Sequence, residues 1–395
     1  MCGFVGFVGG TDNQSEVLTK MMDRIVHRGP DMGGQFIDGR VALGFRRLSI
    51  LDLTEAGAQP MANEDGSVVI VFNGEIYNFQ ELRSELEAKA TSSTAAPTPR
   101  ASCTATRSGA RPYSIVCAVC TPSSSGTKRR TSFLAPATSL ASSRSTTIHG
   151  RCGDGAPGVL FGSEIKSFLD YPHFHKAVNK KALRPYMTLQ YSATEETFFE
   201  GVYKLPPAHY FTVDIPTGKM NIERYWDCDY SAVEKPFEEY VDELDEVVHE
   251  SVEAHRIADV KVASFLSGGV DSSYIAACLM PDKTFSVGFD YKNFNETNYA
   301  KELSDKLGVE NVRKMITADE FFGALEDIQY HMDEPQSNLS SVRCGSWPRW
   351  PARTLPSCFR AKAPTSSLAA TLLRGHGPGA QVQKDGAAAH PSRAR

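Results

Sequence analysis

Cys2 is the residue whose position most directly suggests chemistry, because it follows the initiator methionine. Removal of Met1 would leave cysteine as the N-terminal residue. Its own α-amino group, with a reference pKa of about 7.7–8.0, could then act as the general base for the thiol, so that no histidine is needed. The alternative is that a small second residue merely permits removal of the methionine. Taken alone, Cys2 leaves both interpretations open.

A second chemical pattern is the segment SGGVDSS at 267–273. It follows a β-branched run at 260–266 that predicts a buried strand, and it precedes a helix expected over 272–279. Backbone N–H groups at such a helix start can bind a pyrophosphate, and Asp271 can hold Mg²⁺ against the phosphates. The Walker signature GxxxxGK[ST] is absent. A generic glycine-rich turn is the alternative, although the full heptapeptide is more specific than a bare SGG.

Length and composition describe an ordinary globular protein. The chain has 395 residues, enough for two or three domains, and is 41% hydrophobic and 23% charged. A net charge of −5 gives no indication of nucleic acid or an anionic membrane as a partner. No apolar run approaches the roughly 18 residues of a membrane span, and the N-terminus lacks the basic flank of a signal peptide. We therefore expect a cytoplasmic enzyme.

Hydrophobic patterning outlines the elements that position these residues. Alternation over 1–8 and the β-branched run SVVIVF at 67–72 predict strands, and residues 79–88 read as a short amphipathic helix. Six apolar residues fall at helical spacing and predict a helix with one apolar face: Tyr240, Val241, Leu244, Val247, Val248 and Val252. The sequence of strand, glycine-rich loop and helix around 260–279 predicts the start of an open α/β sheet.

Three motifs give the first part of the chain a family resemblance: HRGPD at 27–31, RLSI at 47–50 and NGEIYN at 73–78. Together with the N-terminal cysteine they resemble the class II glutamine amidotransferases, over about residues 1–90 and 158–227. The resemblance implies an α+β, four-layer sandwich with an N-terminal nucleophile.

Specific roles follow from this resemblance. Cys2 would attack the glutamine side-chain amide, and Asn73 with the backbone N–H of Gly74 would form the oxyanion hole. Arg47 would grip the substrate carboxylate as a bidentate fork, and Glu75 would hold its ammonium. The implied glutamine-binding set is Arg47, Leu48, Ser49, Ile50, Leu51, Asn73, Gly74 and Glu75.

The histidine of HRGPD allows two interpretations. His27 could form a catalytic dyad with Cys2, or the motif could serve a structural turn at Gly29-Pro30. We favour the turn, because glycine and proline are the residues that tight turns select.

The SGGVDSS segment resembles the pyrophosphate loop of ATP pyrophosphatases, which implies an α/β domain that cleaves ATP between its α- and β-phosphates. Leu266 and Val287 would flank the adenine, and Asp271 would be the metal ligand. The implied ATP-binding set is Leu266, Ser267, Gly268, Gly269, Val270, Asp271, Ser272 and Val287.

The order of the two patterns, with the run DEPQS at 333–337, resembles the glutamine-hydrolysing asparagine synthetases. The resemblance implies synthesis of asparagine from aspartate, glutamine and ATP through β-aspartyl-AMP, giving AMP and pyrophosphate. An amidotransferase that adenylates a different carboxylate is the rival within the class. A homodimer stays open.

Two segments, about 91–157 and 343–395, break the patterning. Ser, Thr, Ala, Pro and Arg dominate, and residues 91–153 contain no acidic residue. A disordered basic linker is one interpretation. The other is translation out of frame. If the third base of each codon is joined to the first two bases of the next, residues 358–371 permit LSGEGADELFGGY, the motif that the resembled family carries after DEPQS.

The same shift of the reading frame also yields peptides that resemble this family in the middle segment. Residues 97–110 permit DTE and LHGYEEWG, 115–127 permit RLRGMYAFVVWD, and 132–147 permit LFGARD followed by FGIKPLYY. We therefore favour the frame interpretation, which leaves an inactive, frame-damaged remnant as an alternative function.

The frame interpretation divides the chain into three parts. Residues 1–227 are the amidotransferase domain, of which about 91–157 are out of frame; 228–342 are the first part of a truncated synthetase domain; and 343–395 are an out-of-frame tail. We expect the sandwich to lack several strands, and both odd segments to lack a packed core.

Overall fold

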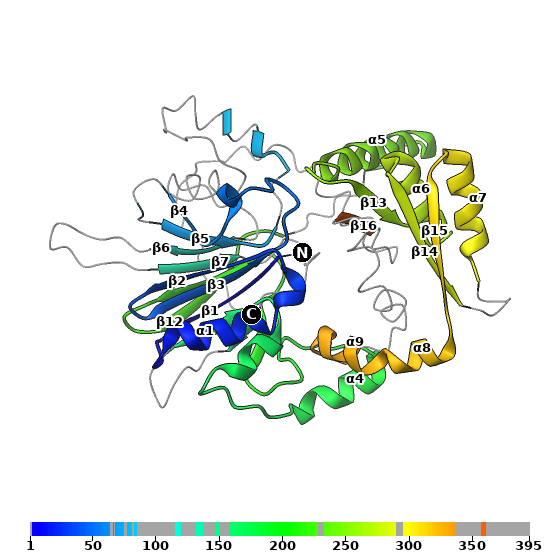
Figure 1. Cartoon of the computed structure of the whole chain (residues 1–395). Coiled ribbons are helices and arrows are strands. Elements are labelled where there is room, and N and C mark those ends of the chain that lie inside the picture. The colour runs from blue at the N-terminus through cyan, green and yellow to red at the C-terminus, as the bar shows by residue number, and fades with distance from the viewer. Residues whose placement is uncertain are drawn as a thin grey trace, which may run out of the picture.

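The computed structural model describes two domains, which Figure 1 shows side by side. The described residues are 2–63, 66, 68–74, 77–80, 83–84, 115–119, 132–136, 147–149, 158–227, 233–289, 295–335 and 357–360. The first domain contains two antiparallel sheets, and the second contains one parallel sheet.

The first sheet of the N-terminal domain has the strand order β10-β8-β9-β1-β3-β2. Its strands are β1 (Gly3–Val8), β2 (Met32–Asp38), β3 (Val41–Arg47), β8 (Thr147–His149), β9 (Val159–Gly162) and β10 (Val202–Lys204). The alternation over 1–8 is confirmed as β1. A Cβ added at Gly6 would lie 2.5 Å from Phe161 and 2.6 Å from the Ala42 carbonyl, so glycine permits this close packing of neighbouring strands.

The second sheet has the order β12-β11-β7-β6-β5-β4. Its strands are β4 (Met61–Ala62), β5 (Val68–Phe72), β6 (Ile115–Val119), β7 (Ser132–Pro136), β11 (His209–Asp214) and β12 (Lys219–Arg224). The strand predicted at 67–72 is therefore present as β5. All five of its residues are buried, as its unbroken apolar run requires.

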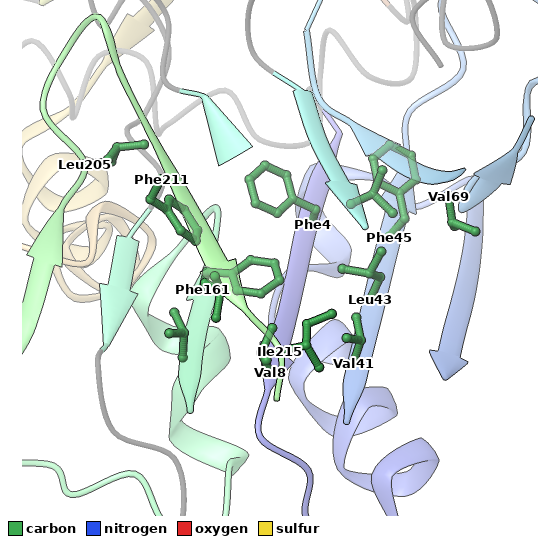
Figure 2. Packing of buried hydrophobic residues seen from close by; sticks show 13 residues of the cluster. Phe4, Val8, Val41, Leu43, Phe45, Val69, Phe161, Leu205, Phe211 and Ile215 are labelled. Atoms are coloured by element: carbon green, nitrogen blue, oxygen red, sulfur yellow. The ribbon is translucent and has the colours of Figure 1, made fainter. Parts of the chain in front are cut away.

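The two sheets pack face to face around an apolar core (Figure 2). The core includes Phe4, Leu43, Phe45, Val69, Val71, Phe161 and Phe211. Helix α1 (Gln14–Asp23) covers the outer face of the first sheet with its apolar stripe. Residues 79–80 and 83–84 are helical, and the rest of the helix predicted over 79–88 lies outside the described residues.

The expectation that the sandwich lacks several strands is wrong for the backbone. Strands β6 and β7 bridge β5 and β11, and β8 lies between β9 and β10. A β-ladder is built from backbone N–H and C=O groups, which almost any residue type supplies. A segment without a strand-like sequence pattern can therefore still occupy a strand position. The predicted loss of core packing concerns side chains of 91–157 and 343–395, which lie outside the described residues.

The second domain is an α/β unit with a parallel sheet in the order β15-β14-β13-β16, which confirms the predicted class. Its strands are β13 (Val262–Phe265), β14 (Lys283–Phe289), β15 (Glu310–Ile316) and β16 (Ser357–Arg360). Its helices are α5 (Phe237–His255), α6 (Val270–Leu279), α7 (Thr297–Leu307), α8 (Ala318–Gly323) and α9 (Leu325–Met332).

The predicted apolar face of α5 packs along only part of its length. Val248 and Val252 are buried against Ile275 and Leu279 of α6. The residues one and two turns earlier are exposed, among them Leu244 at 47%. Helical spacing gave the face correctly but not how much of it is covered.

Short helical turns complete the described elements: η1 (Val26–Arg28), η2 (Glu55–Gly57), η3 (Ile165–Asp170), η4 (Lys180–Ala182) and α4 (Leu183–Leu189). Within the described ranges, no helix has the length and hydropathy that a membrane crossing demands.

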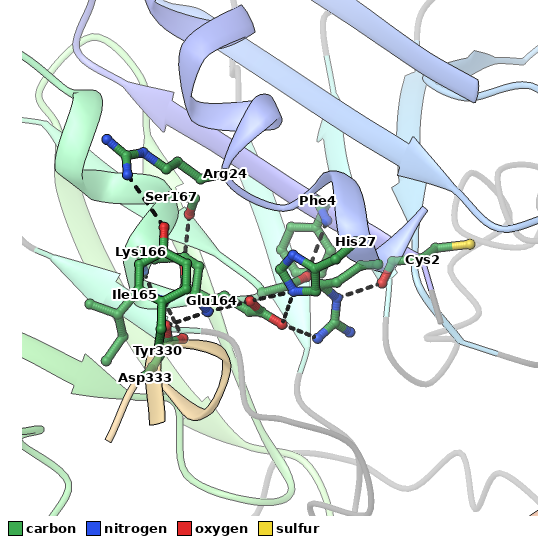
Figure 3. A network of polar contacts seen from close by, with 12 residues as sticks. Cys2, Phe4, Arg24, His27, Glu164, Ile165, Lys166, Ser167, Tyr330 and Asp333 are labelled. Carbon is green, nitrogen blue, oxygen red and sulfur yellow. Dashed lines mark hydrogen bonds and ion pairs between the residues drawn. The ribbon is translucent and has the colours of Figure 1, made fainter. Parts of the chain in front are cut away.

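A buried cluster of charges joins the two domains (Figure 3). Glu164 is 1% exposed, and its carboxylate contacts Arg28 Nη1 at 3.0 Å, His27 Nε2 at 3.0 Å and the Lys166 ammonium. Lys166 also contacts Asp333 Oδ1 of the second domain, at 2.6 Å. Burial would raise the pKa of Glu164, but the hydrogen bond from His27, with Lys166 and Arg28, outweighs burial and lowers that pKa well below its usual range.

The lowered pKa of Glu164 gives a pH prediction. A carboxyl whose pKa is depressed in the folded state stabilises that state above the unfolded pKa of about 4.3, and this contribution is lost as the pH falls through the folded pKa. Glu164→Gln should lower the free energy of unfolding by about 3–5 kcal/mol near neutrality, because Arg28 and Lys166 lose their buried partner. The difference from the parent should shrink once the pH falls below about 4.3.

Urea unfolding of both chains across this pH range measures the difference. Glu16→Gln is the matched control, because Glu16 pairs with Lys20 on the solvent-exposed face of α1 and should change stability little at any pH. A Glu164→Gln difference that is independent of pH would show that the charge of Glu164 is not what stabilises the fold.

Candidate active sites

The Cys2 thiol lies between the start of β1 and the loop that follows β3. The Leu48 N–H donates to Cys2 Sγ at 3.3 Å, and the thiol points back to the Leu48 carbonyl at 3.6 Å. Cys2 is partly buried and packs against the core between the sheets. The structure thus brings together the predicted nucleophile and the predicted RLSI loop.

Arg47 braces that loop from inside. Its guanidinium donates to the carbonyls of Thr54 at 2.8 Å and Leu51 at 3.1 Å, and also to that of Asp52. A Cβ at Gly57 would lie 2.1 Å from Arg47 Nη2, so glycine there makes room for the guanidinium. Arg47 is 5% exposed. Its predicted contact with a substrate carboxylate would share donors that now hold the loop, and it stays a prediction.

The HRGPD motif supports the same loop through its turn. The Ser49 N–H donates to Asp31 Oδ2 at 2.7 Å, and the Asp31 N–H donates to the Arg47 carbonyl at 3.1 Å. A Cβ at Gly29 would lie 2.3 Å from the Arg46 carbonyl oxygen, which accounts for the glycine. His27 faces Glu164 (Figure 3), and this geometry favours the structural interpretation of the motif over a dyad with Cys2.

The predicted oxyanion-hole residues follow β5. Asn73 is half-buried and Gly74 is exposed at the end of that strand. Val69 and Val71 of the same strand belong to the core cluster against which Cys2 packs, so β5 and Cys2 share one core between the two sheets. Glu75, the predicted ligand for the glutamine ammonium, lies outside the described residues.

The charge cluster is the feature that the sequence analysis missed near Cys2. The Arg28 Nε–H donates to the Cys2 carbonyl at 2.8 Å, and Arg28 then contacts Glu164. The available signal was the segment VLFGSEIKSFL, in which Glu164 and Lys166 interrupt an apolar run. Charged residues in such a run are buried only when they are paired, so each predicts a partner elsewhere.

The DEPQS motif, for which sequence patterns predict no role, contributes Asp333 to this cluster. Asp333 Oδ2 accepts the Ile165 N–H at 2.7 Å. Burial raises the pKa of Asp333, although Lys166 opposes the shift. The Asp333 backbone has φ +65°, a region that non-glycine residues rarely enter, so these contacts hold a strained conformation.

The SGGVDSS loop connects β13 to α6 as predicted. Ser267 Oγ and Ser272 Oγ lie 2.8 Å apart, and the Gly269 N–H donates to Ser267 Oγ at 3.3 Å. Gly268 has φ +90°, and a Cβ there would lie 2.7 Å from the Glu296 carbonyl oxygen. The loop thus needs glycine for both conformation and space, and it ends at the N-terminus of α6, where the first backbone N–H groups have no partner within the helix.

The loop also leaves the sheet at its switch point. Strand β13 lies between β14 and β16, so the strand order reverses direction at β13. Ligands of open α/β sheets bind outside the carboxyl ends of the strands at such a reversal. Leu266 is buried under the loop, Val287 is partly buried on β14, and Val270 is 85% exposed at the loop surface. The predicted ATP-binding residues are thus grouped at one end of the sheet.

Asp271 lies in the first turn of α6, half-buried. The described part of the chain contains no group of three His, Cys, Asp or Glu side chains that could hold a metal by themselves. Mg²⁺ at nucleotide sites takes one or two carboxylates together with phosphate oxygens and water, so a single carboxylate beside an anion-binding loop fits that donor set.

Family comparisons match both domains. Residues 1–98 and 152–226 match the family described as glutamine amidotransferase domain, and residues 243–343 match the family described as asparagine synthase. The two matches contain Cys2, the RLSI loop, Asn73 and Gly74 in the first case, and the SGGVDSS loop and Asp333 in the second.

Curated relatives agree with these assignments. The chain is 36% identical over 364 residues to asparagine synthetase [glutamine-hydrolyzing] 1 of Bacillus subtilis, covering 87% of this chain and 54% of the relative. It is 30% identical over 382 residues to a putative asparagine synthetase [glutamine-hydrolyzing] of Mycobacterium tuberculosis, covering 87% of this chain and 56% of that relative. The chain thus spans about half the length of these relatives. By these matches the chain carries a glutamine amidotransferase domain followed by an asparagine synthase domain, and over most of its length it is similar to glutamine-hydrolysing asparagine synthetases.

Proposed function

We propose that this chain carries the two half-sites of an ATP-dependent asparagine synthesis that takes its nitrogen from glutamine. Aspartate would be activated as β-aspartyl-AMP, with AMP and pyrophosphate as the other products. The observation that carries the proposal is the pairing, in one chain, of the Cys2 thiol against the RLSI loop with the SGGVDSS loop at a sheet switch point.

In the first half-reaction, Cys2 Sγ attacks the side-chain amide carbon of glutamine and its proton passes to the cysteine's own α-amino group. Charge develops on the carbonyl oxygen, which Asn73 and the Gly74 N–H would stabilise. Ammonia leaves, and water then hydrolyses the thioester to glutamate. Arg47 would orient the substrate carboxylate and Glu75 its ammonium, with Leu48, Ser49, Ile50 and Leu51 forming the adjoining wall.

In the second half-reaction, the aspartate side-chain carboxylate attacks the α-phosphate of ATP and pyrophosphate leaves. Backbone N–H groups of Gly268, Gly269 and Val270 would bind the pyrophosphate at the positive end of α6. Leu266 and Val287 would contact the adenine. Mg²⁺, when bound, neutralises charge on the leaving pyrophosphate, and Asp271 is the residue that would hold it. Ammonia then attacks the acyl-adenylate and releases AMP.

The rival is an amidotransferase that adenylates a different carboxylate. Not every similar protein is named a synthetase: the chain is 28% identical over 393 residues to a Gibberella zeae protein named amidase chry2. Product analysis with aspartate and with other carboxylates as acceptors separates the two activities.

We also propose that residues of about 91–157 and 343–395 are read out of frame. The match to the amidotransferase family omits 99–151, and the asparagine synthase match stops at 343, which supports both positions. The 395-residue chain would then be an inactive remnant, which is the alternative function. The proposed synthesis of asparagine would belong to a chain whose reading frame is restored.

The coding DNA tests the frame proposal. Over codons 358–371, the shifted frame should encode LSGEGADELFGGY, because the protein constrains all but the first base of each shifted codon. A frame-restored chain should make asparagine, and the 395-residue chain should make none or much less. Any other peptide in the shifted frame would contradict the proposal.

Cys2→Ala tests the nucleophile. In the frame-restored chain it should abolish glutamine-dependent synthesis and spare ammonia-dependent synthesis, because the two chemistries occupy separate domains. Amino-acid analysis of the products measures both. Cys278→Ala, which removes a partly buried thiol of α6, is the control and should keep both activities. Glutamine-dependent turnover by Cys2→Ala would refute the assignment.

Asp271→Asn tests the metal ligand. It should stop pyrophosphate release with either nitrogen source and leave glutaminase activity intact, since a metal stabilises the transition state by several kcal/mol. If Asp271 served only the helix dipole, the cost would be about 0.3–1 kcal/mol of stability and pyrophosphate release would continue. Pyrophosphate assays at saturating Mg²⁺, with thermal unfolding alongside, distinguish the two outcomes.

A further inference from the structure

The two domains touch at several points beside motifs of the glutamine site. The Tyr77 ring lies 4.2 Å from that of His255, the Asp52 N–H donates to Asp259 Oδ2 at 2.7 Å, and Asp333 contacts Lys166 at 2.6 Å. The three contacts adjoin the NGEIYN segment, the RLSI loop and the charge cluster behind Cys2. The second domain therefore forms part of the wall around the first domain's candidate site.

The contact at Asp333 differs from the other two because it continues inward through buried charges (Figure 3). Asp333 binds Lys166, Lys166 binds Glu164, and Glu164 contacts Arg28 at 3.0 Å. The Arg28 Nε–H then donates to the Cys2 carbonyl at 2.8 Å. Arg28, Glu164 and Lys166 are each 6% exposed or less, so water does not screen these interactions.

We propose that Asp333 is a positioning residue for Cys2, acting across the domain interface through Lys166, Glu164 and Arg28. The inference rests on the proposed function, in which the thiol and α-amino group of Cys2 are the reacting groups. Fixing the Cys2 carbonyl fixes the backbone that carries both groups. Glutamine hydrolysis then depends on the second domain being seated, with no substrate contact from that domain required.

Removing the charge of Asp333 should loosen this arrangement stepwise. Lys166 would lose one of its two carboxylate partners and draw closer to Glu164. Lys166 would then compete more strongly with Arg28 for the Glu164 carboxylate. A weaker hold on Arg28 lets its guanidinium turn away from the Cys2 carbonyl. The structure of either domain need not change, because Glu164 keeps two cationic partners.

Glu334 supplies a matched control at the same interface. Its carboxylate pairs with Lys204, and its Oε1 accepts the Phe198 N–H at 3.2 Å. It adjoins Asp333 in sequence and is comparably buried, with side-chain exposures of 12% and 10%. In the described part of the chain, the Glu334–Lys204 pair has no onward side-chain contact to Cys2.

The test uses the 395-residue chain and measures the rate at which iodoacetamide alkylates Cys2, resolved by peptide mass spectrometry, with Cys278 as the internal reference thiol. Asp333→Asn should slow Cys2 alkylation by about 5-fold to 150-fold, the usual span of coupling between sites. Glu334→Gln should change it less than about 2-fold, and the Cys278 rate should stay constant in both. In chains that hydrolyse glutamine, kcat should fall with Asp333→Asn more than KM rises.

A second variant guards against misfolding. Asp333→Glu keeps the charge on a longer arm, so it should recover part of the parental Cys2 rate, with Glu334→Asp as its control. Equal Cys2 rates in the Asp333 and Glu334 variants, with matching thermal unfolding, would overturn the inference. Failure of the proposed function shows separately, as glutamine hydrolysis that survives Cys2→Ala, because the alkylation rate does not depend on turnover.

Discussion

The sharing of the Glu164 carboxylate among Arg28, His27 and Lys166 is the interaction on which the rest of this structure depends. A carboxylate that is 1% exposed is tolerated only because the Arg28 and Lys166 cations and the His27 imidazole contact it. Its partners come from η1, from its own segment and, through Lys166, from the second domain. Core packing within the sandwich does not determine how the domains meet, whereas this cluster contributes directly to their contact through Asp333.

The two candidate sites are held by different physical means. The Cys2 site is built from loops, and hydrogen bonds from Arg47 and Asp31 fix its RLSI segment. The SGGVDSS loop is held instead by the strand and helix that it connects and by the close approach of Gly268 to the Glu296 carbonyl.

The sequence predicted the parts of this structure that local patterns encode. It gave β1, β5, the helix α5, the parallel α/β class and the loops that carry Cys2, Arg47 and Asp271. It missed the cluster of Glu164, Lys166 and Asp333, because each partner is distant in sequence and a charged residue by itself is read as a solvated one. It overestimated the packing of α5, since periodicity identifies a face without identifying what covers it.

The expectation about missing strands failed for a related reason. Composition and period report on side chains, whereas β6, β7, β8 and β16 are defined by backbone pairing. Residue patterns therefore predict cores and sites better than they predict ladders.

The short helices α8 and α9 connect the parallel sheet of the second domain to the N-terminal domain. Strand β15 ends at Ile316, and Thr317 begins α8 with a capping box to Glu320, which fixes the direction in which the chain leaves the sheet. The two helices then run back to the N-terminal domain and end at Asp333 (Figure 1). Because this arm is anchored at both ends, the position of Asp333 and the direction of the parallel sheet are tied to each other through a short stretch of chain. The sheet that carries the SGGVDSS loop and the charge cluster behind Cys2 are in this way joined by one continuous segment, from Ile316 to Asp333.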